Sequence, residues 1–391
     1  MLTARANRSI AIACGGTGGH LFPGMAVAEQ MTRRGWRVTL LISPKDVDQQ
    51  AVRAATSFDL VTLPAVALNR GGGIAFLRGF ARSYHVSRQL FERRRPDAVL
   101  AMGGFTSAPP ILAGRRAGAR TFLHESNTVP GRAIRWLARL ADESFVGFPE
   151  AAGRLHCRKT TVTGTPVRAE FRPRDAAECR AALGLAAERP TLLVMGGSQG
   201  ASGINEMVLE ALPLLTNLVP ELQVIHLTGA RDIERVSAAC AKLGLKSVVQ
   251  AFCHEMHLAL GAATVAISRA GASSLAELAA VQVPAILIPF PAAAGNHQFY
   301  NARAFEQAGS ARLLEQRGAT PELLGRLGQE LIRHAGVREK MRAALAAGHA
   351  PHAADDIAEA ISKAVAAGRG AAGENAVSAS APIHRHLSVV P

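Results

Sequence analysis

The chain contains the same local pattern twice: a short apolar strand, a turn made of glycines, and a helix. The first copy runs from residues 9–14 into Gly15-Gly16-Thr17-Gly18-Gly19-His20, and the second runs from 190–195 into Gly196-Gly197-Ser198-Gln199-Gly200. This order of elements opens a doubly wound parallel sheet. Two copies about 180 residues apart therefore predict an α/β protein with two similar halves.

Other elements are expected to complete these halves. Pro23 suits the first turn of a helix over 25–34, Gly35 its end, and 36–42 a strand. Further strands are expected at 98–102, 121–124, 223–227, 264–268 and 285–288. The predicted domains are residues 1–165 and 166–365, and residues 366–391, rich in Ala, Gly and Ser, are expected to be a disordered tail.

Composition narrows the classes of function. The five cysteines are scattered and never spaced as Cys-x-x-Cys, which argues against a disulfide framework and a structural zinc site. No apolar run is long enough for a membrane span or for the core of a signal peptide. The net charge is +14, of which residues 1–165 carry +13. The basic half is expected to meet an anion, and charge alone leaves nucleic acid, an acidic membrane and a phosphorylated substrate open.

Both glycine turns can present backbone N–H groups at a helix N-terminus, where anions bind. Neither contains the lysine of a P-loop, so an ordinary tight turn is an equal alternative for each one alone. Their matched positions favour a phosphate-binding cleft between the halves. His20 ends the first turn, and imidazole suits a general base, although a lone histidine is more often structural.

The densest group of ligand-type residues opens a predicted helix after an apolar run. The small residues Ala272, Ser273 and Ser274 allow a diphosphate to approach the N–H groups, and Arg269 can offset its charge. Glu277, one turn later, can accept hydrogen bonds from both hydroxyls of a ribose. The alternative is a serine N-cap with an acidic residue in the first turns, as in many helices.

Three further segments carry polar side chains at expected loop positions. His124-Glu125-Ser126-Asn127 and the stretch Asn296 to Asn301 offer amides that suit sugar hydroxyls, with plain loop turns equally possible. Asp46-Val47-Asp48 matches a metal-binding spacing, but an exposed turn explains it better. No His-Glu-x-x-His or Gly-x-Ser-x-Gly motif occurs, so no metal is expected and neither zinc proteolysis nor an α/β-hydrolase has a motif.

A helix from Ile74 onward is predicted in the basic half. One face of it carries Phe76, Leu77, Phe80, Tyr84 and Phe91, flanked by Arg78, Arg82 and Arg93. This pattern is typical of a helix on a membrane surface if it is exposed. A core helix with a solvated basic edge is the somewhat favoured alternative.

Five motifs occur in a specific order within residues 9–365. They are Gly15-Gly16-Thr17-Gly18-Gly19-His20-Leu21-Phe22-Pro23-Gly24, His124-Glu125-Ser126-Asn127, Gly164-Thr165-Pro166-Val167-Arg168, Gly196-Gly197-Ser198-Gln199-Gly200-Ala201 and Ser268-Arg269-Ala270-Gly271-Ala272. As a set they resemble the bacterial peptidoglycan N-acetylglucosaminyltransferases that convert lipid I to lipid II. The resemblance implies a glycosyltransferase-B fold, in which two Rossmann-like doubly wound domains face each other across a cleft.

The same resemblance implies substrates and a location. The donor is UDP-N-acetylglucosamine, held mainly by residues 166–365, and the acceptor is undecaprenyl-pyrophosphoryl-N-acetylmuramoyl-pentapeptide (lipid I). Residues 1–165 form the acceptor and membrane-facing domain. The protein is expected to be peripheral on the cytoplasmic face of the inner membrane, where Phe76, Leu77, Phe80, Arg78 and Arg82 contact anionic lipid. It is expected to use no cofactor and to bind no nucleic acid.

The resemblance also assigns roles to residues of the expected cleft. They are Thr17, Gly18 and Gly19 in its wall; Asn127 and Gln298 at the donor sugar; Arg168 and Ser198 near the diphosphate; the main chain of Ala272, Ser273 and Ser274 at phosphate; Glu277 at the ribose; and Cys253, beside Phe252, at the uracil. Ser126, Thr165 and Phe105 replace the usual Gln, Asn and Tyr of the family, which leaves the acceptor contacts around Phe105 open.

The implied mechanism is a direct, inverting displacement. The acceptor 4-hydroxyl attacks the anomeric carbon with His20 as the candidate base, UDP leaves, and a β-1,4 bond forms. Two other functions fit part of the pattern. A UDP-N-acetylglucosamine 2-epimerase shares the fold and the donor but needs no membrane-facing basic half, and a non-catalytic module at the membrane binds the UDP-sugar without turning it over.

Overall fold

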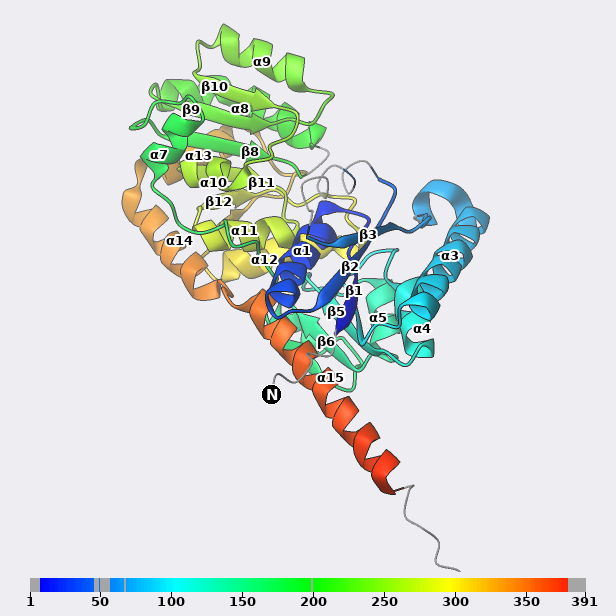
Figure 1. Cartoon of the computed structure of the whole chain (residues 1–391). Helices are drawn as coiled ribbons and strands as arrows, with labels where there is room; N and C mark the ends of the chain where they lie inside the picture. Colours follow the sequence, from blue (N-terminus) through cyan, green and yellow to red (C-terminus); the bar gives the residue numbers. More distant parts are fainter. Residues whose placement is uncertain (1–7, 46–48, 50–56, 67, 198–199, 379–391) are drawn as a thin grey trace, which may run out of the picture.

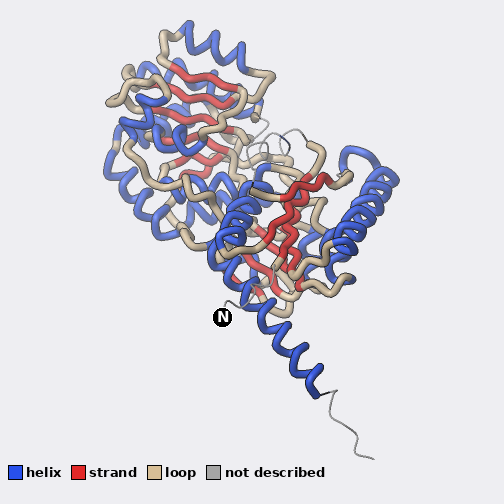
Figure 2. The backbone as a smooth tube through the Cα atoms, viewed as in Figure 1, coloured by secondary structure: helices blue, strands red, loops and turns tan. Residues whose placement is uncertain are grey.

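The computed structural model describes residues 8–45, 49, 57–66, 68–197 and 200–378. The chain forms two α/β halves, each built on one parallel sheet with helices on both faces (Figures 1 and 2). The predicted fold class is confirmed. Each sheet is a continuous apolar layer because its central strands are buried on both sides, as parallel strands between helices must be.

The first half contains a seven-stranded sheet of order β3-β2-β1-β4-β5-β6-β7. Its strands are β1 (Ser9–Ala13), β2 (Arg37–Ile42), β3 (Asp59–Thr62), β4 (Ala98–Ala101), β5 (Arg120–Glu125), β6 (Glu143–Val146) and β7 (Thr160–Val162). Its helices are α1 (Gly18–Arg33), α3 (Leu68–Arg93), α4 (Ala108–Arg116), α5 (Arg132–Ala138) and α6 (Pro149–Ala152). The described pairings between these strands are parallel.

The second half contains a six-stranded sheet of order β10-β9-β8-β11-β12-β13. Its strands are β8 (Thr191–Met195), β9 (Gln223–Leu227), β10 (Ser247–Gln250), β11 (Val265–Ser268), β12 (Ala285–Leu287) and β13 (Ala311–Leu313). The helices of this part of the chain are α7 (Ala176–Ala182), α8 (Ser202–Leu218), α9 (Ile233–Lys242), α10 (Met256–Ala262), α11 (Ala272–Val281), α12 (His297–Gln307), α13 (Pro321–Arg333) and α14 (Ala335–Gly348), with a 3-10 turn at Ala294–Asn296.

Both sheets have a switch point where the strand order reverses direction. In the first sheet it lies between β1 and β4, and in the second between β8 and β11. The loops that leave the carboxyl ends of two such strands run to opposite faces of the sheet, which opens a crevice suited to a ligand. The glycine turns after β1 and β8, and the turns after β4 and β11, are therefore the loops expected to border a site.

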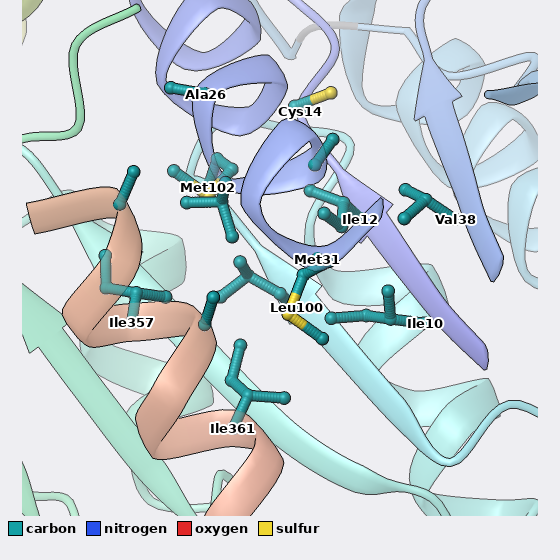
Figure 3. Packing of buried hydrophobic residues seen from close by; sticks show 14 of the residues in the cluster. Ile10, Ile12, Cys14, Ala26, Met31, Val38, Leu100, Met102, Ile357 and Ile361 are labelled. Atoms are coloured by element: carbon teal, nitrogen blue, oxygen red, sulfur yellow. The ribbon is translucent and has the colours of Figure 1, made fainter. Parts of the chain in front are cut away.

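The last helix, α15 (Ala353–Ser378), returns to the first half. Its residues Ile357 and Ile361 have no exposed surface and pack in one core cluster with Met31 of α1 and Leu100 of β4 (Figure 3). Residues 353–365, which we assigned to the second domain, thus pack with the first. Residues 366–378, expected to begin a disordered tail, continue the helix.

Two local predictions differ from the structure. Helix α1 begins at Gly18, with Thr17 as its N-cap, so Pro23 lies inside the helix rather than in its first turn. Gly18, Gly19 and His20 therefore form the first helical turn instead of the end of a loop.

The strands β3, β6, β7, β10 and β13 were not predicted. Each contains polar or charged residues within its three or four positions, whereas β4 and β12, which are equally short, are wholly apolar.

Candidate active site between the two halves

A cavity of about 1440 Å³ lies between the halves, bordered by the loops at both switch points. It brings together most of the residues singled out from the sequence. Those lining it are Thr17, Gly18, Gly19, His20, Asn127, Arg168, Cys253, Arg269, Ala272, Ser273, Ser274, Glu277 and Gln298, together with Phe76 and Phe80 of α3. Ser198 lies outside the described residues. Its neighbours Gly196 and Gly197 line the cavity.

His20 projects from the first turn of α1 and rests on the turn after β4. Its Nδ1 lies 3.1 Å from Oγ1 of Thr17, the N-cap residue. A Cβ atom on Gly103 would lie 2.8 Å from Nε2 of the ring, and one on Gly104 3.1 Å from Nδ1. Both glycines also have positive φ, +111° and +77°. The imidazole therefore needs glycine at both positions.

Phe105 packs against the glycine turn that follows β1. Its ring packs against Gly16, where a Cβ atom would lie 3.0 Å from Cε1 of the ring. The ammonium of Lys45 lies 5.1 Å from the centre of the same ring and donates to the carbonyl of Gly16. Thr106 Oγ1 donates to the carbonyl of Gly15 at 2.7 Å. These contacts hold the glycine turn after β1 in its conformation.

The N-terminus of α11 opens into the cavity from the second half. The N-cap is Gly271, and no side chain makes a capping hydrogen bond there. Ser273 and Ser274 lie inside the first turn, so the alternative of a serine N-cap is wrong. The first N–H groups of an α-helix have no partner within the helix. Small side chains and a glycine cap make this end accessible to an anion.

Arg269, in the turn before α11, is anchored to the protein. Its Nη1 donates to the carbonyls of Ile288 and Pro289, both at 3.0 Å, and the guanidinium lies 5.5 Å from the ring centre of Phe290. Burial lowers the pKa of Arg269 to about 10, so it remains charged at neutral pH. The guanidinium therefore supplies a fixed positive charge at the cavity wall.

Glu277 and Arg168 lie close enough to interact electrostatically. Burial raises the pKa of Glu277 to about 7, and the charge of Arg168 opposes this rise. Arg168 lies 4.5 Å from the ring centre of Phe22 and 4.9 Å from that of Phe171, and pairs with Glu170 at 3.0 Å. The buried Nε of Arg168 has no hydrogen-bond partner among the residues that the structure describes. Arg168 as a residue lines the cavity, so its guanidinium supplies positive charge there.

The segment after β5 is organised by a buried carboxylate. Glu125 Oε1 accepts hydrogen bonds from the backbone and side-chain nitrogens of Asn127, at 2.9 and 2.8 Å, and Oε2 accepts from the backbone of Gly131 at 2.8 Å. Burial raises the pKa of Glu125, and these hydrogen bonds oppose the rise. His124 is fully buried, which lowers its pKa to about 4, and its Nε2 lies 3.1 Å from the carbonyl of Gly164. Of this motif, Glu125, Ser126 and Asn127 reach the cavity.

The two amide side chains of Gln298 and Asn301 have different surroundings. Gln298 lines the cavity, and its Oε1 accepts from the backbone N–H of Phe290 at 2.9 Å, which leaves its amide nitrogen for a ligand. Asn301 has no exposed surface and bonds within the protein. Its expected use on sugar hydroxyls is therefore wrong, because no ligand can reach it.

The aromatic residues that were predicted to share one face of α3 lie in different surroundings. Phe76 and Phe80 are half-buried, lie 6.4 Å apart and face the cavity, while Phe91 is buried. Leu77 is 65% exposed and Ile74, which we had not assigned to that face, is 69% exposed. Arg78 and Arg82 are exposed. Among the described residues the outer surface of α3 is therefore both apolar and basic, and the two phenylalanines do not contribute to it.

Trp136 of α5, which no sequence pattern singled out, is 49% exposed. Arg132 and Arg135 of the same helix line the cavity. Within the described part of the chain, no cluster of three or more potential metal ligands occurs and no helix could cross a membrane. Asp46 and Asp48 lie outside the described residues.

Comparisons with known proteins identify the family. The glycosyltransferase family 28 N-terminal domain matches residues 10–146, and the family 28 C-terminal domain matches residues 191–360. A curated protein of an Anaeromyxobacter species, named "UDP-N-acetylglucosamine--N-acetylmuramyl-(pentapeptide) pyrophosphoryl-undecaprenol N-acetylglucosamine transferase", is 38% identical over 89% of this chain and 91% of its own. A protein of the same name from Parasynechococcus marenigrum is 40% identical over 83% of this chain and 87% of its own.

Solved structures agree with this match. The crystal structure of Acinetobacter baumannii MurG superposes with a TM-score of 0.71 at 26% identity, over 91% of this chain and 99% of that one. A putative UDP-N-acetylglucosamine 2-epimerase from Listeria monocytogenes reaches a TM-score of 0.67 at 16% identity, over 91% of this chain and 96% of that one. That second likeness concerns the fold alone. The fold is therefore common to transferases and epimerases, whereas the sequence identity favours the transferases. The chain belongs to the MurG family of glycosyltransferase family 28.

Proposed function

We propose that this chain transfers N-acetylglucosamine from UDP-N-acetylglucosamine to the 4-hydroxyl of lipid I, forming lipid II with a β-1,4 bond. The observation that carries the proposal is one cavity in which His20 of the first half and the α11 N-terminus of the second lie together. Its volume of about 1440 Å³ exceeds that of most small-molecule pockets, roughly 300–1,000 Å³. It therefore has room for a nucleotide sugar and the head of an acceptor.

The donor half of the site follows from the charges and donors of the second domain. The free N–H groups of the first turn of α11, over Ala272 to Ser274, bind the diphosphate, and Ser198 adds its hydroxyl. Arg168 and Arg269 offset the negative charge that grows on UDP as it leaves. Glu277 accepts from the ribose hydroxyls, and Cys253 lies beside the uracil. No divalent ion is needed in this arrangement.

His20 acts as the general base. Attack requires an unprotonated ring nitrogen that faces the acceptor hydroxyl. The contact between Nδ1 and Thr17 Oγ1, 3.1 Å apart, suits the tautomer in which Nδ1 carries the proton, and in that tautomer Nε2 is the basic nitrogen. Asn127 and Gln298 bind the donor sugar, so that the anomeric carbon lies in line between the acceptor oxygen and the diphosphate.

The protein works at the cytoplasmic face of the inner membrane as a peripheral enzyme. Leu77, Arg78 and Arg82 on the outer surface of α3 contact anionic lipid, and Ile74 joins them because it is 69% exposed. Phe76 and Phe80, which line the cavity, contact the acceptor instead of the bilayer. The cavity thus opens beside the membrane surface in which the acceptor lies.

Vesicle binding tests this orientation. Each basic residue near an anionic surface contributes about 1 kcal/mol, so Arg78→Glu with Arg82→Glu should lower binding at least roughly thirtyfold at low salt. Ile74→Ser with Leu77→Ser should lower it at high salt as well, because apolar insertion is not screened. Leu323→Ser, at an exposed leucine of α13, is the matched control. If both double variants cosediment with vesicles like the wild type, the membrane face lies elsewhere.

The transfer itself is tested with labelled UDP-N-acetylglucosamine and a lipid I analogue. We expect labelled disaccharide lipid and UDP release that depends on the acceptor. Conversion of the UDP-sugar without acceptor would indicate an epimerase, and tight UDP-sugar binding with no turnover would indicate a binding module. Either result would overturn the proposal.

A further inference from the structure

One buried carboxamide joins the two halves beside the cavity. Asn301 of α12 has no exposed surface. Its Oδ1 accepts hydrogen bonds from the backbone N–H and the hydroxyl of Thr128, both at 3.0 Å. Its Nδ2 donates to Asn127 Oδ1 at 3.0 Å and to the carbonyl of Ala270 at 3.2 Å. Asn301 therefore connects the loop after β5 to the turn that precedes α11.

The chemistry of the partners determines which way each amide points. The backbone N–H of Thr128 can only donate and the carbonyl of Ala270 can only accept, so the oxygen and nitrogen of Asn301 cannot be exchanged. Asn127 must then present its oxygen to Asn301. Its nitrogen must face Glu125 Oε1, the carboxylate oxygen 2.8 Å away, which can only accept. The two amides are held in one arrangement.

This arrangement leaves one specific group of Asn127 for a ligand. Its oxygen accepts from Asn301 and one of its two N–H bonds points to Glu125. The second N–H is the donor that remains, on a side chain that lines the cavity. A sugar hydroxyl or acetamido oxygen is an acceptor of the right type. The direction of this N–H depends on Asn301, which no ligand touches.

We infer that Asn301 is a positioning residue for the transfer reaction. It orients the Asn127 carboxamide and ties it to the turn before α11, so that the contact with the donor sugar and the diphosphate site keep a fixed separation. This inference rests on the proposed function, because it assumes that Asn127 binds the donor sugar. Without Asn301, the N–H of Thr128 and the carbonyl of Ala270 would also lose their partner.

A double-mutant cycle tests whether Asn301 acts through Asn127. The variants are Asn301→Ala, Asn127→Ala and the double variant, assayed for kcat and KM with UDP-N-acetylglucosamine and a lipid I analogue. Asn301→Ala should lower kcat/KM about 30-fold or more in the wild-type background, as loss of a buried hydrogen-bond partner does. In the Asn127→Ala background the further loss should be less than about threefold, because the shared contact is already gone. The Kd of UDP should stay within about threefold.

Gln223 provides the matched control. It is a fully buried amide of the same half, bonded to the backbone of Ala186 and Arg189 at the start of β9, away from the carboxyl strand ends that border the cavity. Gln223→Leu should lower the melting temperature while leaving kcat/KM within about twofold of the wild type. This comparison separates a positioning effect from a general loss of stability.

Thr128 keeps the inference testable if Asn301→Ala fails to fold. Thr128→Val preserves the shape but removes the hydroxyl that donates to Asn301, and should lower kcat/KM about three- to tenfold. Thr128→Ser retains the hydroxyl and should restore activity. Equal losses from Asn301→Ala in both backgrounds, or no loss from either Asn301→Ala or Thr128→Val, would overturn the inference. Absence of transfer by the wild type would instead refute the proposed function.

Discussion

Replacing Glu277 with glutamine should stabilise the ligand-free protein at pH 8 and weaken its binding of UDP. Burial raises the pKa of Glu277 to about 7, whereas the same group in the unfolded chain titrates near 4.5. Between these two pH values the folded protein holds a proton that the unfolded chain has lost. The free energy of unfolding therefore falls as pH rises from about 4.5 to 7. A glutamine does not titrate and avoids this loss.

The size of the effect follows from the shift. A rise of about 2.5 pKa units corresponds to about 3 kcal/mol, which is an upper limit because Glu277 lines a cavity that water enters. We expect the variant to gain about 1–3 kcal/mol over the wild type between pH 5 and pH 8. The affinity for UDP should fall about tenfold, because an amide offers a neutral oxygen where the carboxylate makes charge-assisted hydrogen bonds to the ribose.

Urea unfolding of wild type and variant at several pH values between 5 and 8.5, without ligand, measures the first effect. Calorimetric titration with UDP at pH 8 measures the second. If the difference in unfolding free energy stays constant with pH, the carboxylate ionises normally and the reasoning about its burial is wrong. If the affinity for UDP is unchanged, Glu277 does not hold the ribose.

Three more predictions concern the reacting end of the cavity. His20→Ala should lower kcat about 10²- to 10⁴-fold and leave the affinity for UDP-N-acetylglucosamine within a few-fold; near-normal turnover in a single-turnover assay would exclude His20 as the base. Gly103→Ala should lower kcat about tenfold or more, because the new methyl would lie 2.8 Å from the imidazole at a φ of +111°. Gly336→Ala, with nothing within 4 Å of the new methyl, is its control, and equal kcat in both variants would contradict the proposed contact. Transfer activity should persist in EDTA because helix N–H groups and arginines stabilise the negative charge of the leaving UDP. A loss of activity that added metal reverses would indicate a metal site at Asp46 and Asp48.

Sequence reasoning was most successful where a function depends on consecutive residues. The central strands and the glycine turns after β1 and β8 were predicted from short stretches, and parallel topology then places those turns at switch points. Thr17, Gly18, Gly19 and His20 line the cavity for this reason. Local sequence determines both the strand and the turn that leaves it.

Contacts between distant segments were not predictable from such stretches. Gly103 and Gly104 support His20 only because β1 and β4 are neighbours in the sheet. Phe76 and Phe80 are less exposed than Leu77 because they face the cavity between the halves, whereas Leu77 faces outward. Asn301 is another example, since an amide at an expected loop position suggested a sugar contact, but the side chain is buried and joins two segments of the protein. Periodicity gives the face of a helix but not what that face meets.

The position of α15 bears on how the two halves are joined. Because α15 packs in the first half, the chain passes between the halves twice, before β8 and after α14. The two crossings touch: a Cβ atom on Gly164 would collide with that of Ala350. The two adjacent crossings therefore form one covalent connection between the halves, so the site residues of the two halves must be aligned by non-covalent contacts at the cavity. The hydrogen bonds of Asn301 to Thr128, Asn127 and Ala270 are such contacts, and they link the loop after β5 in the first half to the turn before α11 in the second.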